Sequence, residues 1–378
     1  MATQVASVSP TMAVLDVLSG FWSARAVYIA AKLGLADLVQ DGPKSAGQLA
    51  VLTGTHAPSL YRVLRALAGI GWFEEDASGR FGPTSLTSGL QTGVPGSLRH
   101  LAMTELGEEH YPAWGDLLFS VKTGELAFNR VFGMANWEFW AGHPENAQIF
   151  NQAMSEVTAV LEPAVLEALD FSPFDKIVDV GGGRGTLMAS ILRAYPNARG
   201  VVLDLPHVIE LGRQHIDHQG LSARCELVPR DFFEGVPQGG DAYILKWVIH
   251  DWDDERSIAI LKNCHRAMSP NGKLFVVEAV IPPGNEPFFH KFMDLNMLVM
   301  TGGRERTEAE YRTLFEAARG RAQGGLTPAW SRRRESARAR RGSGRNVRLL
   351  NDQRAHPMIS FKPPITRASS SSDARAMR

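Results

Sequence analysis

Apolar residues near the start of the chain recur at the three- and four-residue spacing of amphipathic helices. The spacing covers residues 11–33, 45–53 and 60–70. Ser45 precedes the second stretch and Gln48 stands three residues later, which is the signature of a capping box. The pattern predicts three helices, with Ser45 as the cap of the second.

Two short segments follow these helices, Trp-Phe-Glu-Glu at 72–75 and Arg-Phe-Gly-Pro at 80–83, and they flank a turn at 76–79. Three helices and a hairpin are the layout of a winged helix, but a layout does not determine function. DNA binding requires basic residues on the third helix, where only Arg62 and Arg65 qualify. We therefore expect a dimerisation or scaffold role and no nucleic-acid partner.

The pattern changes after residue 174 to short apolar runs that alternate with helical spacing. Such alternation predicts a parallel sheet with right-handed crossovers. The expected fold class is α/β, a Rossmann-like sheet preceded by a mostly helical winged-helix domain. The expected strands are 176–180, 201–204, 225–228, 241–247 and 273–278, and the expected helices include 205–218, 253–268 and 307–318.

A glycine-rich turn follows the first of these strands, in the run Asp-Val-Gly-Gly-Gly-Arg-Gly at 179–185. Glycine allows positive φ angles and close backbone approach, and the next helix presents free N–H groups. The spacing Gly181-x-Gly183-x-Gly185 lacks the third glycine of a dinucleotide motif, because Thr186 stands in its place. It resembles motif I of S-adenosylmethionine-dependent methyltransferases. A tight turn without a ligand is the alternative.

Charged residues stand at the carboxyl ends of the strands, where ligands bind to open α/β sheets. These residues are Asp179, Asp204, Asp231, Lys246 and Glu278. Asp204 follows Gly183 by 21 residues, about the separation at which an acidic residue meets a ribose diol.

His250 lies just after the fourth strand, on the side expected for the cofactor. Its ordinary pKa near neutrality suits a general base, whereas a loop-fixing histidine is the alternative. Asp253, Asp254 and Glu255 open the next helix, where the macrodipole favours acids. Adjacent carboxylates on one helical turn point apart, so we expect no metal.

Five segments recur together in one family: 179–185, Leu-Asp-Leu-Pro at 203–206, Asp-Phe-Phe at 231–233, Leu-Lys-Trp-Val-Ile-His-Asp-Trp at 245–252, and Gly-Arg-Glu-Arg-Thr at 303–307. Over about residues 12–318 the chain resembles the caffeate-type small-molecule O-methyltransferases. These include plant phenylpropanoid enzymes and bacterial tailoring enzymes of secondary metabolism. The resemblance implies an S-adenosylmethionine-dependent O-methyltransferase.

The resemblance also implies a homodimer and a role for each site residue. The acceptor is a hydroxyl of an aromatic or polyketide-type small molecule. His250 removes its proton, with Glu278 and Glu305 flanking the ring. The cofactor is held at Gly181, Gly183, Asp204, Asp231, Phe232 and Lys246. The acceptor pocket is lined by Phe150, Met154, Trp247, Asp294, Met297 and Met300.

Composition adds information about the compartment. The two cysteines, Cys225 and Cys264, have no metal-binding spacing and fit a reducing environment. The N-terminus lacks the basic and apolar regions of a signal peptide, and we find no run of about 18 apolar residues. We therefore expect a cytoplasmic protein without a membrane span.

The formal net charge of zero conceals a basic end. From residue 319 onward the chain holds 14 Arg and one Lys against three acids, so residues 1–318 carry a net charge of −12. The family continues here with two antiparallel strands, but this segment offers only 346–350 and 358–361 as weak strand candidates. We expect a disordered tail, from a reading-frame change in a GC-rich gene or as a genuine tail for nucleic acid or an acidic partner.

The expected domains are therefore a dimerisation domain at 1–105, a catalytic domain at 106–318 and the tail at 319–378. Two other functions stay open at this point. One is a winged-helix regulator that senses a ligand, and the other is an inactive product of the altered end. The identity of the acceptor is not readable from generic apolar pocket residues.

Overall fold

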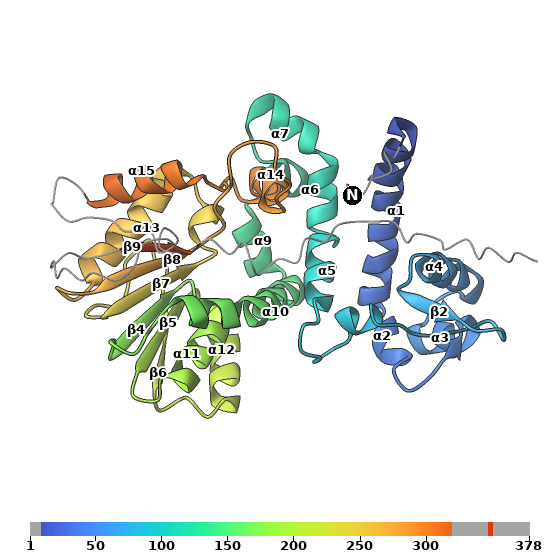
Figure 1. Cartoon of the computed structure of the whole chain (residues 1–378), viewed down its shortest axis with the longest axis horizontal. Helices are drawn as coiled ribbons and strands as arrows, with labels where there is room; N and C mark the ends of the chain where they lie inside the picture. Colours follow the sequence, from blue (N-terminus) through green and yellow to red (C-terminus); the bar gives the residue numbers. More distant parts are fainter. Residues whose placement is uncertain (1–8, 320–346, 351–378) are drawn as a thin grey trace, which may run out of the picture. The chain divides into compact units, whose positions relative to one another are not determined.

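The computed structural model describes residues 9–319 and 347–350 (Figure 1). The chain divides between Ser88 and Gly89 into two compact units. The domain boundary expected at residue 105 stays a prediction. The expected tail lies mostly outside the described residues, and so does its strand candidate at 358–361.

The first unit has the predicted helices and hairpin. A third short strand, which the pattern did not predict, adds to the hairpin, so the antiparallel sheet has the order β1-β3-β2. The elements are α1 (Pro10–Lys32), α2 (Leu35–Leu38), β1 (Lys44–Ser45), α3 (Ala46–Thr53), α4 (Ala57–Gly69), β2 (Phe73–Glu75), β3 (Arg80–Pro83) and η1 (Thr87–Leu90), the last of which crosses into the second unit.

Local hydrogen bonds explain where these helices start. The Gln48 amide N–H donates to the Ser45 hydroxyl at 3.2 Å, and the Ser45 N–H donates to the Gln48 side chain at 2.8 Å. This reciprocal pair satisfies two N–H groups that the helix leaves unpaired, and it confirms the predicted capping box.

The first helix, α1, keeps many apolar side chains exposed. They include Met12, Leu15, Val17, Leu18, Phe21 and Trp22, which are each at least half exposed. In the described part of the chain, α1 is also the single helix long and apolar enough to cross a membrane by length and composition, a test that soluble core helices pass as well. An apolar surface of this extent marks an interaction site.

The second unit begins with helices that precede the large sheet. They are α5 (Arg99–Glu105), α6 (His110–Gly115), α7 (Leu117–Thr123), α8 (Ala127–Phe132), α9 (Asn136–Gly142) and the long α10 (Pro144–Ala168). Aromatic residues of this region form a buried cluster around Phe128, Phe139 and Trp140. The aromatic rings of this cluster are therefore mainly core.

The large sheet is parallel, with the strand order β6-β5-β4-β7-β8-β9. The chain leaves β4 in one direction toward β6 and returns to the other side of β4 at β7, which creates a crevice at the carboxyl ends of the strands. The elements are β4 (Lys176–Val180), α11 (Thr186–Ala194), β5 (Arg199–Asp204), α12 (Pro206–His218), β6 (Cys225–Pro229), β7 (Ala242–Lys246), η2 (Ile249–Asp251), α13 (Asp254–Ala267), β8 (Lys273–Val277), α14 (His290–Met300), α15 (Glu308–Arg319) and β9 (Val347–Leu350).

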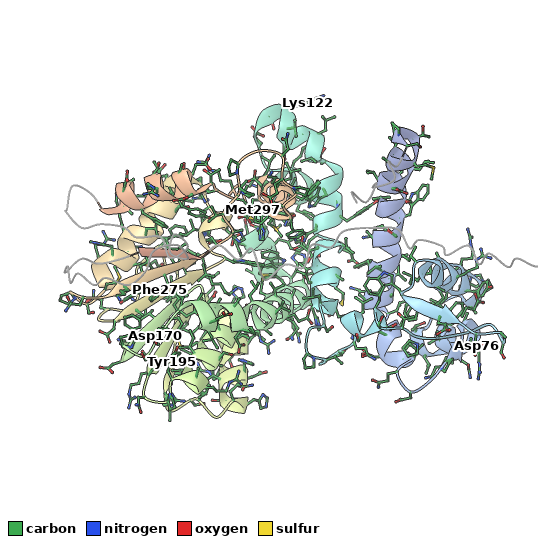
Figure 2. The ribbon with its side chains drawn as sticks, in the orientation of Figure 1. Asp76, Lys122, Asp170, Tyr195, Phe275 and Met297 are labelled. Carbon is green, nitrogen blue, oxygen red and sulfur yellow. The ribbon has the colours of Figure 1, made fainter. Side chains whose placement is uncertain are left out.

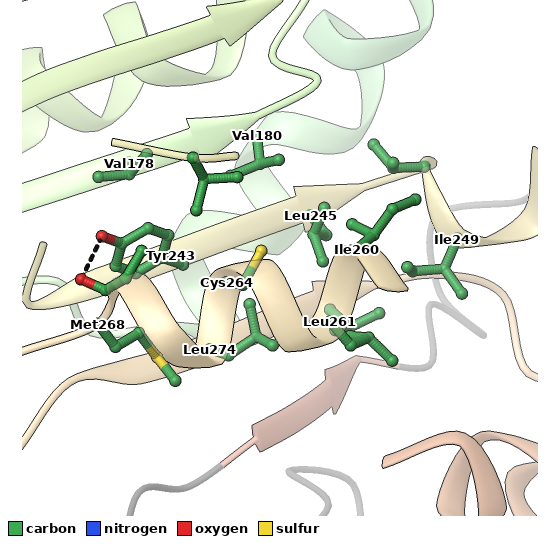
Figure 3. Packing of buried hydrophobic residues seen from close by; sticks show 14 of the residues in the cluster. Val178, Val180, Tyr243, Leu245, Ile249, Ile260, Leu261, Cys264, Met268 and Leu274 are labelled. Carbon is green, nitrogen blue, oxygen red and sulfur yellow. Dashed lines mark hydrogen bonds between the residues drawn. The ribbon is translucent and has the colours of Figure 1, made fainter. Parts of the chain in front are cut away.

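Alternate side chains of each strand enter two different cores, because successive residues point to opposite faces of a sheet. Tyr243 and Leu245 of β7 join the cluster under α13 and α15, whereas Ile244 joins the cluster under α10, α11 and α12. Figure 1 shows α13 and α15 on one face of the sheet and α11 and α12 on the other. Figure 3 shows the first cluster, where the Tyr243 hydroxyl donates to the Ala267 carbonyl at 3.0 Å.

The strand β9 lies at one of the two strand candidates of the atypical end. It pairs in parallel with β8, where Leu274 is opposite Val347 and Val277 is opposite Leu350. In the described residues, β8 is therefore bordered by a parallel strand and not by the antiparallel pair expected from the family. Four residues of one strand cover this edge of the sheet.

Candidate active site

The glycine turn after β4 has the geometry that a nucleotide cradle requires. Gly181, Gly183 and Gly185 have φ angles of 70°, 59° and 79°, which side-chain-bearing residues rarely adopt. A methyl group built on Gly183 would meet no atom within 4 Å, so its backbone faces open space. The turn ends at the N-terminus of α11, where free N–H groups and the helix dipole favour an electron-rich ligand.

Asp204, at the end of β5, is bonded to this turn. Its carboxylate accepts the N–H of Gly183 at 2.8 Å and the N–H of Leu205 at 2.8 Å. Burial raises the pKa of Asp204, although both N–H donors oppose the shift. The structure therefore brings Gly183 and Asp204 together, whereas the contact of Asp204 with a ribose that the 21-residue spacing predicted stays a prediction.

Lys246 and Asp179 lie on neighbouring strands, β7 and β4. Burial lowers the pKa of Lys246, and the carboxylates of Asp179 and Glu278 oppose that shift. Burial raises the pKa of Asp179 to about 7, against the attraction of Lys246. Lys246, which is half-buried, and the buried acids Asp179 and Glu278 thus share the carboxyl edge of the sheet, and groups with pKa values perturbed in this way cluster at functional sites.

Asp231 and Phe232 follow β6. The Asp231 carboxylate accepts the N–H of Phe233 at 2.8 Å, which holds a tight local turn. The Phe232 ring meets the Trp252 ring edge to face, with centroids 6.0 Å apart. An aromatic edge thus lies beside the glycine turn, and a methyl group on Gly181 would come within 3.7 Å of the Phe232 ring.

His250 is buried with two glutamates from distant parts of the chain. Its Nδ1 lies 3.0 Å from Glu305 Oε1 and 3.8 Å from Glu278 Oε2. Glu278 Oε1 also accepts the N–H groups of Val248 and Ile249, at 2.9 and 2.8 Å. Since Nδ1 is paired with Glu305, Nε2 is the ring nitrogen left to exchange a proton.

Electrostatics make this imidazole unusually basic. Burial by itself lowers the pKa of His250, but the carboxylates of Glu278, Asp251 and Glu305 overcome burial and raise it to about 10. Within the described part of the chain, one buried oxygen of Glu278 and one of Glu305 have no hydrogen-bond partner, so their charge acts on the ring directly.

Three of the predicted acceptor residues lie near this histidine or near the aromatic cluster. Trp247 has a φ of 54°, and its ring centroid is 5.9 Å from that of His250. Phe150, on α10, stacks on Trp140 with ring centroids 4.0 Å apart. Met154 follows Phe150 by one helical turn and is partly exposed.

The other three predicted acceptor residues are on α14. Asp294 accepts the N–H of Glu305 at 2.8 Å, so it also holds the segment that carries Glu305. Met297, labelled in Figure 2, is buried and accepts a hydrogen bond from the Thr301 hydroxyl at 3.6 Å. Met300 is packed in the aromatic cluster with Phe128.

Two parts of the site escaped sequence reasoning. Trp137 stacks on Trp252 with centroids 5.9 Å apart, and only the fold brings these rings together. Arg306 is fully buried and bonded to the backbone next to His250. Its position between Glu305 and Thr307 in a recognised motif was the one available signal.

Two family models match this chain. An O-methyltransferase dimerisation domain matches residues 15–92, and an O-methyltransferase domain matches residues 114–320. The second match covers more than half of the chain and ends where the atypical segment begins.

Characterised relatives agree with these models. A phenazine O-methyltransferase of Lysobacter antibioticus is 48% identical over 80% of this chain and 89% of its own length. A mitomycin biosynthesis 6-O-methyltransferase of Streptomyces lavendulae is 39% identical over 80% of this chain and 86% of its own.

A solved structure adds the cofactor. An O-methyltransferase from neocarzinostatin biosynthesis, in complex with S-adenosylmethionine and 2-hydroxy-5-methyl naphthoic acid, is 32% identical. It matches with a TM-score of 0.71 over 82% of this chain and 92% of its own. These matches lend no support to a ligand-sensing regulator. The chain therefore belongs to the O-methyltransferase family that uses S-adenosylmethionine as its methyl donor.

Proposed function

We propose that His250 is the general base that prepares a hydroxyl of an aromatic acceptor for methylation. The observation that carries this proposal is the buried group of His250, Glu278 and Glu305 at the carboxyl edge of the sheet. A phenol of pKa about 10 is a weak nucleophile until a base takes its proton.

The bound cofactor supplies a methyl group on a positively charged sulfur. His250 Nε2 would accept the acceptor's hydroxyl proton as the oxygen takes the methyl group and the carbon–sulfur bond breaks, which leaves the neutral thioether S-adenosylhomocysteine as the second product. Glu305 accepts a hydrogen bond from Nδ1, which sets the tautomer and stabilises the imidazolium that results. Glu278 contributes a second negative charge and holds the loop through two backbone N–H groups.

For the cofactor, we propose that Gly181 and Gly183 hold the methionine part. Asp204 reaches the ribose with a carboxylate that already contacts the turn. Asp231 and Phe232 meet the adenine, and Lys246 adds a contact at the end of β7. The open space over Gly183 and the aromatic edge at Phe232 support this assignment.

We propose a planar, hydroxylated aromatic acceptor. The names of two relatives, a phenazine enzyme and a 3-amino-4-hydroxybenzoate enzyme, support this class, and so do the aromatic rings near the site. The proposed pocket residues are Phe150, Met154, Trp247, Asp294, Met297 and Met300. Two free, buried cysteines support the proposed cytoplasmic location.

The test of the base is His250→Asn, measured with a panel of hydroxyphenazines and hydroxybenzoates. We expect turnover to fall by about 10² to 10⁴-fold, which is the usual contribution of a general base. Calorimetric titration should show wild-type affinity for S-adenosylmethionine, because His250 does not hold the cofactor. Turnover near the wild-type rate would refute the assignment.

A further inference from the structure

We infer that Arg306 is a positioning residue for His250. Its guanidinium donates to the carbonyl oxygens of Ile249 and Trp252, on either side of the histidine, and so fixes where the imidazole meets the acceptor. This inference rests on the proposed role of His250 as the base.

The bonds of Arg306 account for its complete burial. An arginine carries five N–H donors, and here each has an acceptor. Nη1 donates to the Ile249 carbonyl at 3.0 Å and to the Arg304 carbonyl at 3.2 Å. Nη2 donates to the Trp252 carbonyl at 2.7 Å, while Nη2 and Nε both donate to Asp254 Oδ1, at 3.0 and 3.1 Å.

These contacts, together with those of Glu278, hold the loop that carries His250, residues 247–252. Glu278 accepts the N–H groups of Val248 and Ile249 on the side where the loop begins. Arg306 donates to the carbonyl of Ile249, just before the histidine, and to the carbonyl of Trp252, where the loop ends. The Glu278 carboxylate therefore accepts from N–H groups of this loop, and the Arg306 guanidinium donates to its carbonyl oxygens.

The loop needs such support because its backbone is strained at the start. Trp247 has a φ of 54°, a conformation that a tryptophan keeps only when its surroundings impose it. Ile249 anchors the loop further, since it belongs to the same buried cluster as Ile260 and Leu261 (Figure 3).

The segment that carries Arg306 lies directly against the loop. A methyl group on Gly303 would overlap the His250 carbonyl oxygen and the Asp251 carbonyl carbon, so only glycine permits this approach. From that position the same segment delivers Glu305 to the imidazole and Arg306 to the carbonyls. The two side chains thus set the ring and its backbone together.

Three variants test the inference in the full-length protein, with the panel acceptor that turns over fastest. Arg306→Lys keeps the buried charge but cannot reproduce five donors in a planar fork. Asp254→Asn removes the negative charge that pairs with the guanidinium, at a side chain that is half exposed. Arg304→Gln is the matched control, because Arg304 also pairs with Asp254 but is half exposed and touches no carbonyl of the loop.

We expect Arg306→Lys to lower the rate of a single turnover by about 100-fold, since a misplacement of 1 Å costs that much. Asp254→Asn should lose less, and Arg304→Gln should stay within about twofold of wild type. Calorimetric affinity for S-adenosylmethionine should be unchanged in all three. The loss in Arg306→Lys should also shrink at alkaline pH, where the acceptor's hydroxyl ionises without a base.

A cycle with His250→Ala separates positioning from general damage. If Arg306 acts through the histidine, Arg306→Lys slows the His250→Ala enzyme no further. An equal loss in both backgrounds, or a wild-type rate in Arg306→Lys, would overturn the inference while leaving the base assignment intact. Full activity of His250→Ala would instead remove the proposed function itself.

Discussion

At the scale of single residues, the proposed chemistry rests on the acids that surround one imidazole. His250 has acids on both ring nitrogens, with Glu305 at 3.0 Å from Nδ1 and Asp251 at 3.9 Å from Nε2. Burial raises the pKa of Asp251 to about 7, and the negative charges of Glu278 and Glu305 add to that shift. The raised pKa of His250 makes it a strong base once it is neutral.

This predicts the pH dependence of catalysis. Only neutral His250 can accept a proton, so kcat/KM should rise with pH through a midpoint well above the ordinary histidine value of about 6.5. Glu305→Gln removes one of the charges that raise the pKa, so the midpoint should fall by at least about one pH unit. A pH–rate profile of both proteins measures this, and an unmoved midpoint would contradict the proposed pairing.

At the scale of elements, α1 carries the proposal of a homodimer. The family model that matches residues 15–92 is a dimerisation domain, and α1 exposes Leu18 and Trp22 by 54% and 69%. Each Å² of apolar surface that two such helices remove from water contributes about 25 cal/mol of free energy, which favours their pairing. We therefore propose that α1 forms part of the interface between two copies.

Leu18→Asp should turn the dimer into a monomer, because it places a charge in an apolar interface without a partner. Light scattering after size-exclusion chromatography gives the mass of each species. Val51→Asp is the matched control, since Val51 is 84% exposed on α3 of the same unit. A dimer that survives Leu18→Asp would place the interface elsewhere.

At the scale of the whole molecule, the large sheet is regular at the strands that carry the candidate site and unusual at its β9 edge. The strands β4, β5 and β7 that carry the site are paired on both sides, whereas β8 is bordered by the four residues of β9. The O-methyltransferase model stops matching at residue 320. We propose that residues 319–378 replace the usual end of the domain and leave the sheet less stable.

A chimera tests this proposal, with residues 319–378 exchanged for the C-terminal segment of the Lysobacter relative. We expect the midpoint of thermal unfolding to rise by about 2 °C or more, the shift that about 1 kcal/mol gives in a domain of this size. Calorimetric titration with S-adenosylmethionine should show equal or tighter binding. An unchanged midpoint would mean that the native end already completes the sheet.

Much of this protein was readable from local sequence. Hydrophobic periodicity located strands β4 to β8 and helices α1, α3, α4, α12, α13 and α15 to within a few residues, because period 2 and period 3.6 follow from backbone geometry alone. The Ser45 capping box was predicted from contacts within one turn. The glycine turn and Asp204 followed from spacing along a single β-α-β unit.

Tertiary structure decided what depends on residues far apart in the chain. Glu305 lies 55 positions from His250, and Arg306 lies 57 positions from Ile249. A family motif could flag these residues, but no local pattern could reveal which atoms they bond, how far burial and three acids move the pKa of one histidine, or that only Gly303 admits the segment that brings them. Periodicity reports which face of an element is buried, whereas the packing of distant elements determines what that face meets.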